Sequence, residues 1–212
     1  MYNSTQQMQE WASIFGRDYT NRTYQNVEEM NDLYMGNFGI NRANLNEQFL
    51  DSLDRSIKIL EIGCNTGAQL QCLRQMGFTQ LYGIELQRYA IKALREQTPY
   101  IDVLQGNIFN IPFYDKCFDL VFTSGILIHI HPNDLHIAMN EIYRCTKKYI
   151  WGYEYYSDKY TMVSYRDKKN LLWKADFMQM YLDQFPNLVL VKENRLKYLK
   201  NDNVDSMFLL SY

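Results

Sequence analysis

The sequence predicts one α/β domain built around a mainly parallel, doubly wound sheet. Short apolar runs alternate with helical patterns from residue 57 onward, which is the order of strand–helix–strand units. The last two runs have no helix between them, so the last strand should lie antiparallel to the others. The chain has 212 residues, 47% of them hydrophobic, and no Gly/Ser-rich or Pro-rich linker, which suits a single domain over 1–212 with a sizeable core.

Residues 1–55 should form a helical arm ahead of the sheet. Apolar residues recur at helical spacing over 8–15, and Gly16 predicts the end of that helix. Asn26 and Asn41 are suitable N-caps for two further helices. We therefore expect three helices in this arm, which could close over the sheet as a lid.

The core is expected over residues 56–212. Helical patterns predict a helix after the first strand, another after the second, and others over 133–145 and near 174–185. The polar residues near 156–175 are interpreted as an insertion on the acceptor side of the core. Apolar runs predict strands at 57–62, 81–85, 101–105, 118–123, 149–153, 188–196 and 207–212.

A glycine-containing turn after the first strand is the main functional signal. Gly63 and Gly67 lie between that strand and a helix, where glycine allows a ligand close to the backbone and the helix N-terminus offers unpaired N–H groups. Glu85 ends the second strand, where a carboxylate can accept both hydroxyls of a ribose. This pair predicts an adenosine-containing cofactor. The spacing G-x-x-x-G differs from the G-x-G-x-x-G turn that serves the pyrophosphate of NAD.

The segment Glu61–Gly67 resembles motif I of class I S-adenosylmethionine-dependent methyltransferases, with Asn65 where a glycine is usual. The resemblance continues through Glu85, Asn107 and Ser124, which follow the second, third and fourth strands. It implies a Rossmann-like fold with S-adenosyl-L-methionine as the cofactor. The cofactor-binding residues that it implies in this core are Glu61, Gly63, Cys64, Asn65, Gly67, Glu85, Leu86, Asn107, Ile108 and Ser124.

The flanking segments resemble the pseudaminic acid biosynthesis-associated methylase family over nearly the whole chain. This resemblance implies a bacterial enzyme that methylates a nitrogen or an oxygen of a nonulosonic (pseudaminic/legionaminic-type) sugar or its precursor. Within the arm, Tyr19 and Arg22 could fold over the cofactor and Arg22 could pair with its carboxylate, although a surface salt bridge is an alternative for Arg22. The similar segments are Glu10–Gly16, Asp18–Arg22, Glu141–Cys145, Glu154–Tyr156 and Leu171–Lys174.

Two ionisable residues are candidates for catalysis and for binding the acceptor. His129 lies just beyond the fourth strand, and its ordinary pKa of about 6.5 suits a general base; the alternative is a loop histidine bonded to the backbone. Glu154 closes the fifth strand and could bind an acceptor amine or take its proton, unless it is a solvated strand end. Tyr155 and Trp173 are further candidates for binding the acceptor, with ordinary packing as the alternative.

Composition limits the partners and the location. The formal net charge is −2 and the basic residues are scattered, which disfavours a nucleic-acid partner. No apolar run is long enough to span a membrane and residues 1–10 lack a signal-peptide core, so we expect a cytoplasmic protein. None of the four cysteines forms a C-x-x-C pair, and no metal is expected. A small-molecule acceptor is the expected partner; the sequence does not indicate the oligomeric state.

Methyl transfer to a small molecule is the leading hypothesis, with three alternatives. The first is a non-catalytic S-adenosylmethionine-binding module, suggested by Asn65 and by Asn107, which stands where Asp is common. The second is an NAD-linked oxidoreductase, which the spacing of the glycine turn opposes. The third is methylation of a protein or RNA, which the charge disfavours; no N/D-P-P-Y/F/W motif follows the fourth strand.

Overall fold

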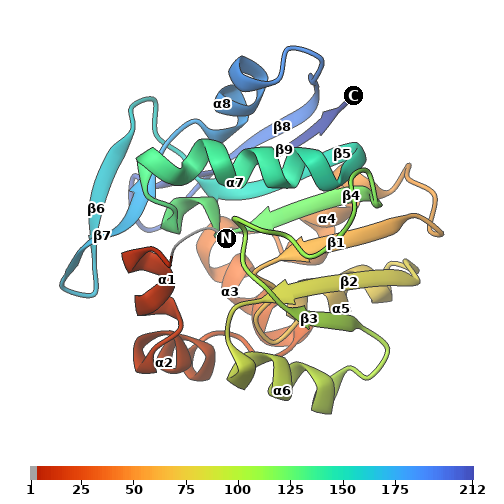
Figure 1. The fold of residues 1–212 in the computed structure, drawn as a ribbon, viewed down its shortest axis with the longest axis horizontal. Coiled ribbons are helices and arrows are strands. Elements are labelled where there is room, and N and C mark those ends of the chain that lie inside the picture. Colours follow the sequence, from red (N-terminus) through yellow and green to blue (C-terminus); the bar gives the residue numbers. More distant parts are fainter. Residues whose placement is uncertain (1–3) are drawn as a thin grey trace.

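The computed structural model describes residues 4–212 and is organised around a seven-stranded sheet (Figure 1). The strand order is β3-β2-β1-β4-β5-β9-β8. The first five strands pair in parallel, and β9 lies antiparallel between β5 and β8, which confirms the predicted Rossmann-like topology and its antiparallel last strand. The strands are β1 (Lys58–Ile62), β2 (Gln80–Glu85), β3 (Asp102–Gln105), β4 (Phe118–Ser124), β5 (Thr146–Tyr155), β8 (Val189–Lys197) and β9 (Val204–Ser211).

Helices bury both faces of the sheet, as a parallel sheet requires. One face carries α7 (Pro132–Cys145) and α8 (Phe177–Gln184), whose apolar residues share a core cluster with β4 and β5. The opposite face carries α5 (Ala68–Gln75) and α6 (Arg88–Gln97) in a second cluster. No helix joins β3 to β4; the loop between them covers that part of the first face with Ile108, Phe109 and Ile111.

The described part of the N-terminal arm, residues 4–55, contains four helices rather than the three predicted: α1 (Gln6–Trp11), α2 (Ile14–Arg22), α3 (Val27–Phe38) and α4 (Arg42–Leu50). The prediction that Gly16 ends the first helix is wrong. The chain breaks at Ala12 because the Ser13 side chain accepts from the Phe15 N–H and caps a new helix, in which Gly16 is buried. The predicted caps are confirmed, since the side chains of Asn26 and Asn41 accept from backbone N–H groups of α3 and α4.

Residues near 156–175 contain a second, two-stranded sheet, which was not predicted because the segment is polar. Strands β6 (Thr161–Tyr165) and β7 (Lys168–Lys174) pair antiparallel across a two-residue turn, Arg166-Asp167, in which both residues have positive φ (49° and 61°). The following helix begins only at Phe177, where the Asp176 side chain provides the cap. No helix within residues 4–212 is long and apolar enough to cross a membrane.

Helices α1 and α2 lie beside the β6–β7 hairpin although the two are far apart in sequence (Figure 1). The Gln7 side-chain amide donates to the Asn170 carbonyl at 2.9 Å, and Lys168 forms an ion pair with Glu10 at 2.8 Å. The arm and the hairpin therefore meet at the end of the sheet where the parallel strands β1 to β4 terminate.

Candidate functional site

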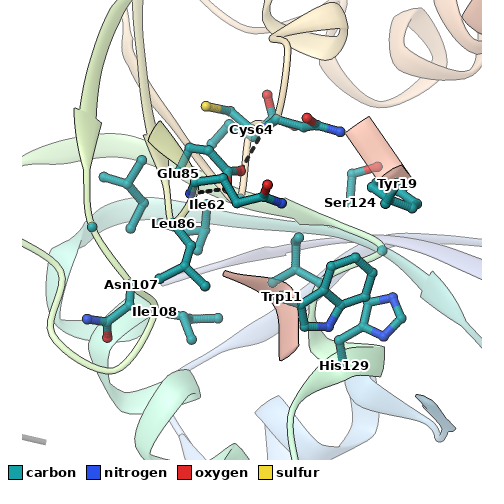
Figure 2. Close-up of a pocket in the computed structure, with 18 of the residues that line it drawn as sticks. Trp11, Tyr19, Ile62, Cys64, Glu85, Leu86, Asn107, Ile108, Ser124 and His129 are labelled. Carbon is teal, nitrogen blue, oxygen red and sulfur yellow. Dashed lines mark hydrogen bonds between the residues drawn. The ribbon is translucent and has the colours of Figure 1, made fainter. Parts of the chain in front are cut away.

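A cavity opens at the carboxyl ends of β1, β2, β3 and β4, and its empty space is about 1120 Å³ including the part open to solvent (Figure 2). The chain runs outward from β1 to β3 and then returns to β4 on the other side of β1, so the cavity lies at the reversal of strand order. Open α/β sheets bind ligands at this point. Its lining comes from 61–69, 84–87, 106–109 and 124–130, and from the arm over 5–24.

The turn after β1 brings bare backbone to the cavity. Gly63 has φ +71° and its N–H donates to the Ile84 carbonyl at 2.8 Å, which ties the turn to β2. A Cβ on Gly63 would lie 2.4 Å from Cδ1 of Ile126, so a side chain there would displace Ile126 and would also be strained by the positive φ. Gly67, also left-handed, is outside the lining; it begins α5 against Leu94 and shapes the turn.

Asn65 has a left-handed backbone conformation, which glycine adopts most readily. Its φ is +45°, a region that Asn tolerates better than most residues. Its side-chain oxygen accepts from the Thr20 hydroxyl of α2 at 2.9 Å. The substitution therefore preserves the turn and adds a bond between the turn and the arm.

Glu85 has a fixed carboxylate at the end of β2. Its Oε2 accepts from the Asn65 N–H at 2.9 Å and its Oε1 accepts from the Gln87 N–H at 2.8 Å (Figure 2). Each oxygen has a further lone pair for a ligand hydroxyl. Burial raises the pKa of Glu85, and the two backbone N–H groups act against that shift.

Glu61 is a buried carboxylate on the cavity wall with an unsatisfied oxygen. Its side chain is 4% exposed, and Oε2 has no hydrogen-bond partner among the described residues. Burial raises the pKa of Glu61 well above its usual value, while the Arg42 guanidinium acts in the opposite direction. A buried acceptor without a partner is costly, so this position fits a ligand that donates, above all a cationic amine.

The remaining predicted cofactor residues of the core all line the cavity. Leu86, Asn107 and Ile108 gather on one side of the cavity in Figure 2, and Cys64 and Ser124 also line it. The Asn107 side-chain oxygen accepts from the Phe109 N–H at 2.9 Å, so it shapes its own loop.

The loop 125–129 after β4, called here the β4 loop, places His129 on the cavity wall. Nδ1 of His129 lies 2.6 Å from the Leu171 carbonyl oxygen of β7. A carbonyl only accepts, so Nδ1 carries the proton and Nε2 has a free lone pair. Burial lowers the pKa of His129 to about 4, and it is therefore neutral at pH 7.

Aromatic rings enclose His129 from the arm and the hairpin. The Trp11 ring centroid lies 4.5 Å from that of His129 and 5.3 Å from that of Tyr19, and Tyr165 lies 5.5 Å from His129. Trp11 and His129 face each other at the end of the cavity opposite Asn107 (Figure 2). The sequence placed Trp11 in a predicted helix but did not identify it as a residue of the cavity. Helical periodicity does not indicate a partner more than a hundred residues away.

Besides Gly67, four predicted site residues are not in the lining. Arg22 is exposed, with its guanidinium over the rings of Phe15 and Tyr19 rather than directed into the cavity. Trp173 is buried with its ring edge-on to His131, and Tyr155 is partly buried. Glu154 is 1% exposed beneath the β4 loop, so it is not the solvated strand end that the sequence left open.

Arg42 is a buried cation that sequence reasoning missed. It is 0% exposed, donates to Asn46 at 2.9 Å and to the Tyr34 hydroxyl, and approaches the Ser124 hydroxyl at 3.4 Å. With its amide oxygen turned toward the guanidinium, Gln69 accepts from Arg42 at 2.9 to 3.1 Å. Because Ser124 and Gln69 line the cavity, Arg42 supports the wall from behind. Its helix position carries no motif that could have identified it.

Part of the chain is similar in sequence to known methyltransferases. Residues 60–149 match the family described as "Methyltransferase domain". An uncharacterized methyltransferase of Alkaliphilus oremlandii (strain OhILAs) is 34% identical over 80 residues, which are 38% of this chain and 36% of that protein. The match thus spans about a third of the length of this curated relative.

Solved structures share the whole fold at low sequence identity. A Pyrococcus horikoshii OT3 protein superposes with a TM-score of 0.70 at 16% identity, covering 94% of this chain and 98% of that chain. The 1,6-didemethyltoxoflavin-N1-methyltransferase of Burkholderia thailandensis, solved with 1,6-didemethyltoxoflavin and S-adenosylhomocysteine, has a TM-score of 0.68 at 12% identity, covering 100% of this chain and 92% of that one. Residues 60–149, which match the methyltransferase domain family, include the turn after β1, the end of β2 and the β4 loop. Residues 60–149 are therefore similar to a methyltransferase domain, and the chain shares the Rossmann-like fold of these solved structures.

Proposed function

We propose that this chain binds S-adenosyl-L-methionine and transfers its methyl group to a nitrogen or an oxygen of a small molecule. The observation that carries the proposal is the cavity at the reversal of strand order, where bare backbone at Gly63 lies near a carboxylate fixed at the end of β2. The match of residues 60–149 to a methyltransferase domain supports it independently.

The residues present fit this cofactor. Glu85 has a free lone pair on each oxygen and would accept from the two ribose hydroxyls. The unsatisfied Oε2 of Glu61 would accept from the ammonium of the methionine portion. Leu86 and Ile108 offer apolar surface for the adenine, and Tyr19 closes the cavity from the arm. When bound, S-adenosylmethionine supplies an electrophilic methyl group on a sulfonium sulfur.

His129 is the candidate base toward the acceptor. Its Nδ1 bond to the Leu171 carbonyl fixes the ring and leaves the Nε2 lone pair unprotonated at neutral pH, while the lowered pKa of about 4 makes Nε2 a weaker base than the ordinary imidazole with a pKa of 6.5. A hydroxyl or ammonium acceptor must lose a proton, whereas a neutral amine needs only to be held in line. Trp11 covers the same end of the cavity and would exclude water there.

We also propose a nonulosonic sugar or its precursor as the acceptor, on the resemblance of the flanking segments. Glu10 in one of these segments forms an ion pair with Lys168 of β7, the strand that also carries the segment Leu171–Lys174. In this proposal Tyr155 and Trp173 support the acceptor-binding wall, and Arg22 holds the arm through its ring contacts. Methylation of a protein or RNA remains the alternative substrate class.

Calorimetry with S-adenosylmethionine and S-adenosylhomocysteine tests the first step, and the absence of binding would remove the proposal. A screen for mass gains of one methyl group in nonulosonic acids and their nucleotide-activated forms tests the acceptor. Binding without turnover on any acceptor would favour a non-catalytic binding module, and a bound nicotinamide cofactor would favour an oxidoreductase. With an acceptor in hand, His129→Ala should lower turnover by roughly 100-fold or more while cofactor affinity stays nearly unchanged.

A further inference from the structure

We propose that Glu154 is a positioning residue that holds the β4 loop, and through it both the turn that faces the cofactor and the imidazole that faces the acceptor. This inference rests on the proposed methyl transfer. It gives Glu154 a role without contact to either ligand, because its carboxylate is buried below the cavity rather than on its wall.

The contacts of Glu154 are directed at the backbone of one short segment. Oε1 accepts from the Ile126 N–H at 3.2 Å and Oε2 accepts from the Ile128 N–H at 3.3 Å. One carboxylate thus bonds to two N–H groups two residues apart. The neighbouring Gly125 N–H donates to the Tyr153 carbonyl of the same strand at 2.8 Å, and Gly125 has φ +68°. The end of β5 therefore fixes the path of the β4 loop.

The segment held by Glu154 reaches both halves of the cavity. Ile126 packs on Gly63 so closely that a Cβ on the glycine would lie 2.4 Å from its Cδ1. At the other end of the loop, His129 faces Trp11 and bonds to the Leu171 carbonyl. A shift of the loop would therefore disturb the cofactor turn and the candidate base together.

The surroundings of Glu154 are apolar and contain few groups that titrate. The charge of Glu154 interacts electrostatically with the ionisable side chain of Tyr181 in α8, and burial holds the pKa of Tyr181 well above 10. Thr123 of β4 hydrogen-bonds the carboxylate, and Ser206 is its register partner on β9. The adjacent Asp205 bonds instead to the hydroxyls of Tyr153 and Tyr198.

The charge of this carboxylate is poised to change near neutral pH. Burial raises the pKa of Glu154 to about 7, and hydrogen bonds from Thr123 and the β4-loop backbone limit the rise. The ionised form accepts with both oxygens, whereas the protonated form carries a proton that competes with the loop N–H donors. A shift of the loop that leaves the carboxylate buried would remove these donors and raise its pKa further, so ionisation favours the held loop as the pH rises through about 7. Global unfolding differs, because it exposes the carboxylate to water.

The test compares wild type, Glu154→Gln and a matched control, Glu141→Gln. Glu141 also accepts a backbone N–H, from Ile111 at 2.8 Å, but lies outside the cavity lining. S-adenosylhomocysteine affinity is measured between pH 6 and pH 8 by calorimetry, and the amide resonances of Ile126 and Ile128 are followed by NMR over the same range. Wild type should bind more tightly as the pH rises, and both amides should shift with a midpoint near 7.

In Glu154→Gln the affinity at pH 8 should fall about tenfold, and its pH dependence and the amide titration should disappear. Glu141→Gln should keep the pH dependence of binding and the titration of the two amides. The inference is overturned if the two amides of wild type do not titrate, or if they titrate equally in Glu154→Gln, which would assign the transition to another group such as Asp205. Should wild type fail to bind S-adenosylhomocysteine while its amides titrate, the proposed function fails and the role of Glu154 in holding the loop survives. If Glu154→Gln does not fold, the titration of the Ile126 and Ile128 amides in wild type decides by itself whether the inference holds.

Discussion

The two halves of the cavity are built in different ways. The nucleotide half is formed by consecutive strand–helix turns, and Glu85 fixes it with bonds to Asn65 and Gln87, 20 and 2 positions away. The acceptor half is assembled from the arm, the β4 loop and the β6–β7 hairpin; its bond between Gln7 and Asn170 spans 163 positions. The first half therefore follows from local backbone geometry, and the second exists only once the chain has folded.

This difference has an energetic consequence. Backbone hydrogen bonds to a buried carboxylate hold the nucleotide half, whereas ring contacts and the solvent-accessible pair between Lys168 and Glu10 hold much of the acceptor half. An exposed ion pair contributes little, so the arm should open at a free energy well below that of global unfolding. The following predictions test this contrast.

Gly63→Arg should produce the largest effect, the loss of measurable S-adenosylhomocysteine binding. A Cβ at this position already meets Ile126 at 2.4 Å in a backbone with φ +71°, and the longer side chain would enter the cavity. Gly36→Arg is the matched control, because a Cβ on Gly36 meets nothing within 4 Å. Calorimetry on both variants checks the prediction, and near-normal binding by Gly63→Arg would contradict the placement of the cofactor.

Glu85→Ala should weaken S-adenosylhomocysteine binding by roughly 100-fold, since charge-assisted hydrogen bonds contribute about 1.5–3 kcal/mol each. The variant also frees the N–H groups of Asn65 and Gln87, so the turn after β1 should lose order. Glu96→Ala, on the exposed side of α6, should bind normally. An unchanged affinity in Glu85→Ala would place the ribose elsewhere.

Trp11→Ala should open the acceptor half and leave the nucleotide half closed. The variant removes ring contacts to Phe15, Tyr19, His129 and Tyr165, and each such pair contributes about 0.5–1.5 kcal/mol. Hydrogen exchange should accelerate at least roughly tenfold in α1 and remain unchanged in β1 and β2. Tyr114→Ala, at an aromatic residue that is 89% exposed, should change neither region. Equal acceleration in both regions would mean that the halves open as one unit.

His129 should give the smallest effect, a pH-dependent difference in thermal stability. Its pKa of about 4 in the folded chain lies below its ordinary value of 6.5, so its stabilising contribution is present above pH 6.5 and is lost as the pH falls toward 4. The melting temperature of wild type minus that of His129→Asn should therefore shrink by several degrees over this range. The raised pKa of Glu154 has the opposite effect, because it makes the folded chain less stable against unfolding as the pH rises through 7. Both proteins contain Glu154, so its contribution cancels in the difference between their melting temperatures.

Sequence reasoning was most accurate where position along the chain fixes position in space. Glu61, Gly63 and Glu85 line the cavity as predicted because β1 and β2 are adjacent parallel strands that end at the same edge. Prediction from the sequence was least accurate for Glu154 and the β6–β7 hairpin. The end of β5 suggested an exposed carboxylate because nothing local indicates that the β4 loop covers it, and the Arg166-Asp167 turn lacks the glycine that usually identifies such a hairpin.

By itself, the sequence determined the alternation of strands and helices, the glycine turn at the first strand and the acidic residue at the end of the second. These features depend on periodicity and backbone freedom, which are properties of short segments. Only the tertiary structure decided that Trp11 would cover His129, that Arg42 would be buried behind Ser124, and that Glu154 would hold a loop. Those contacts join segments 28 to 118 positions apart, and their partners are chosen by the packing of the whole fold.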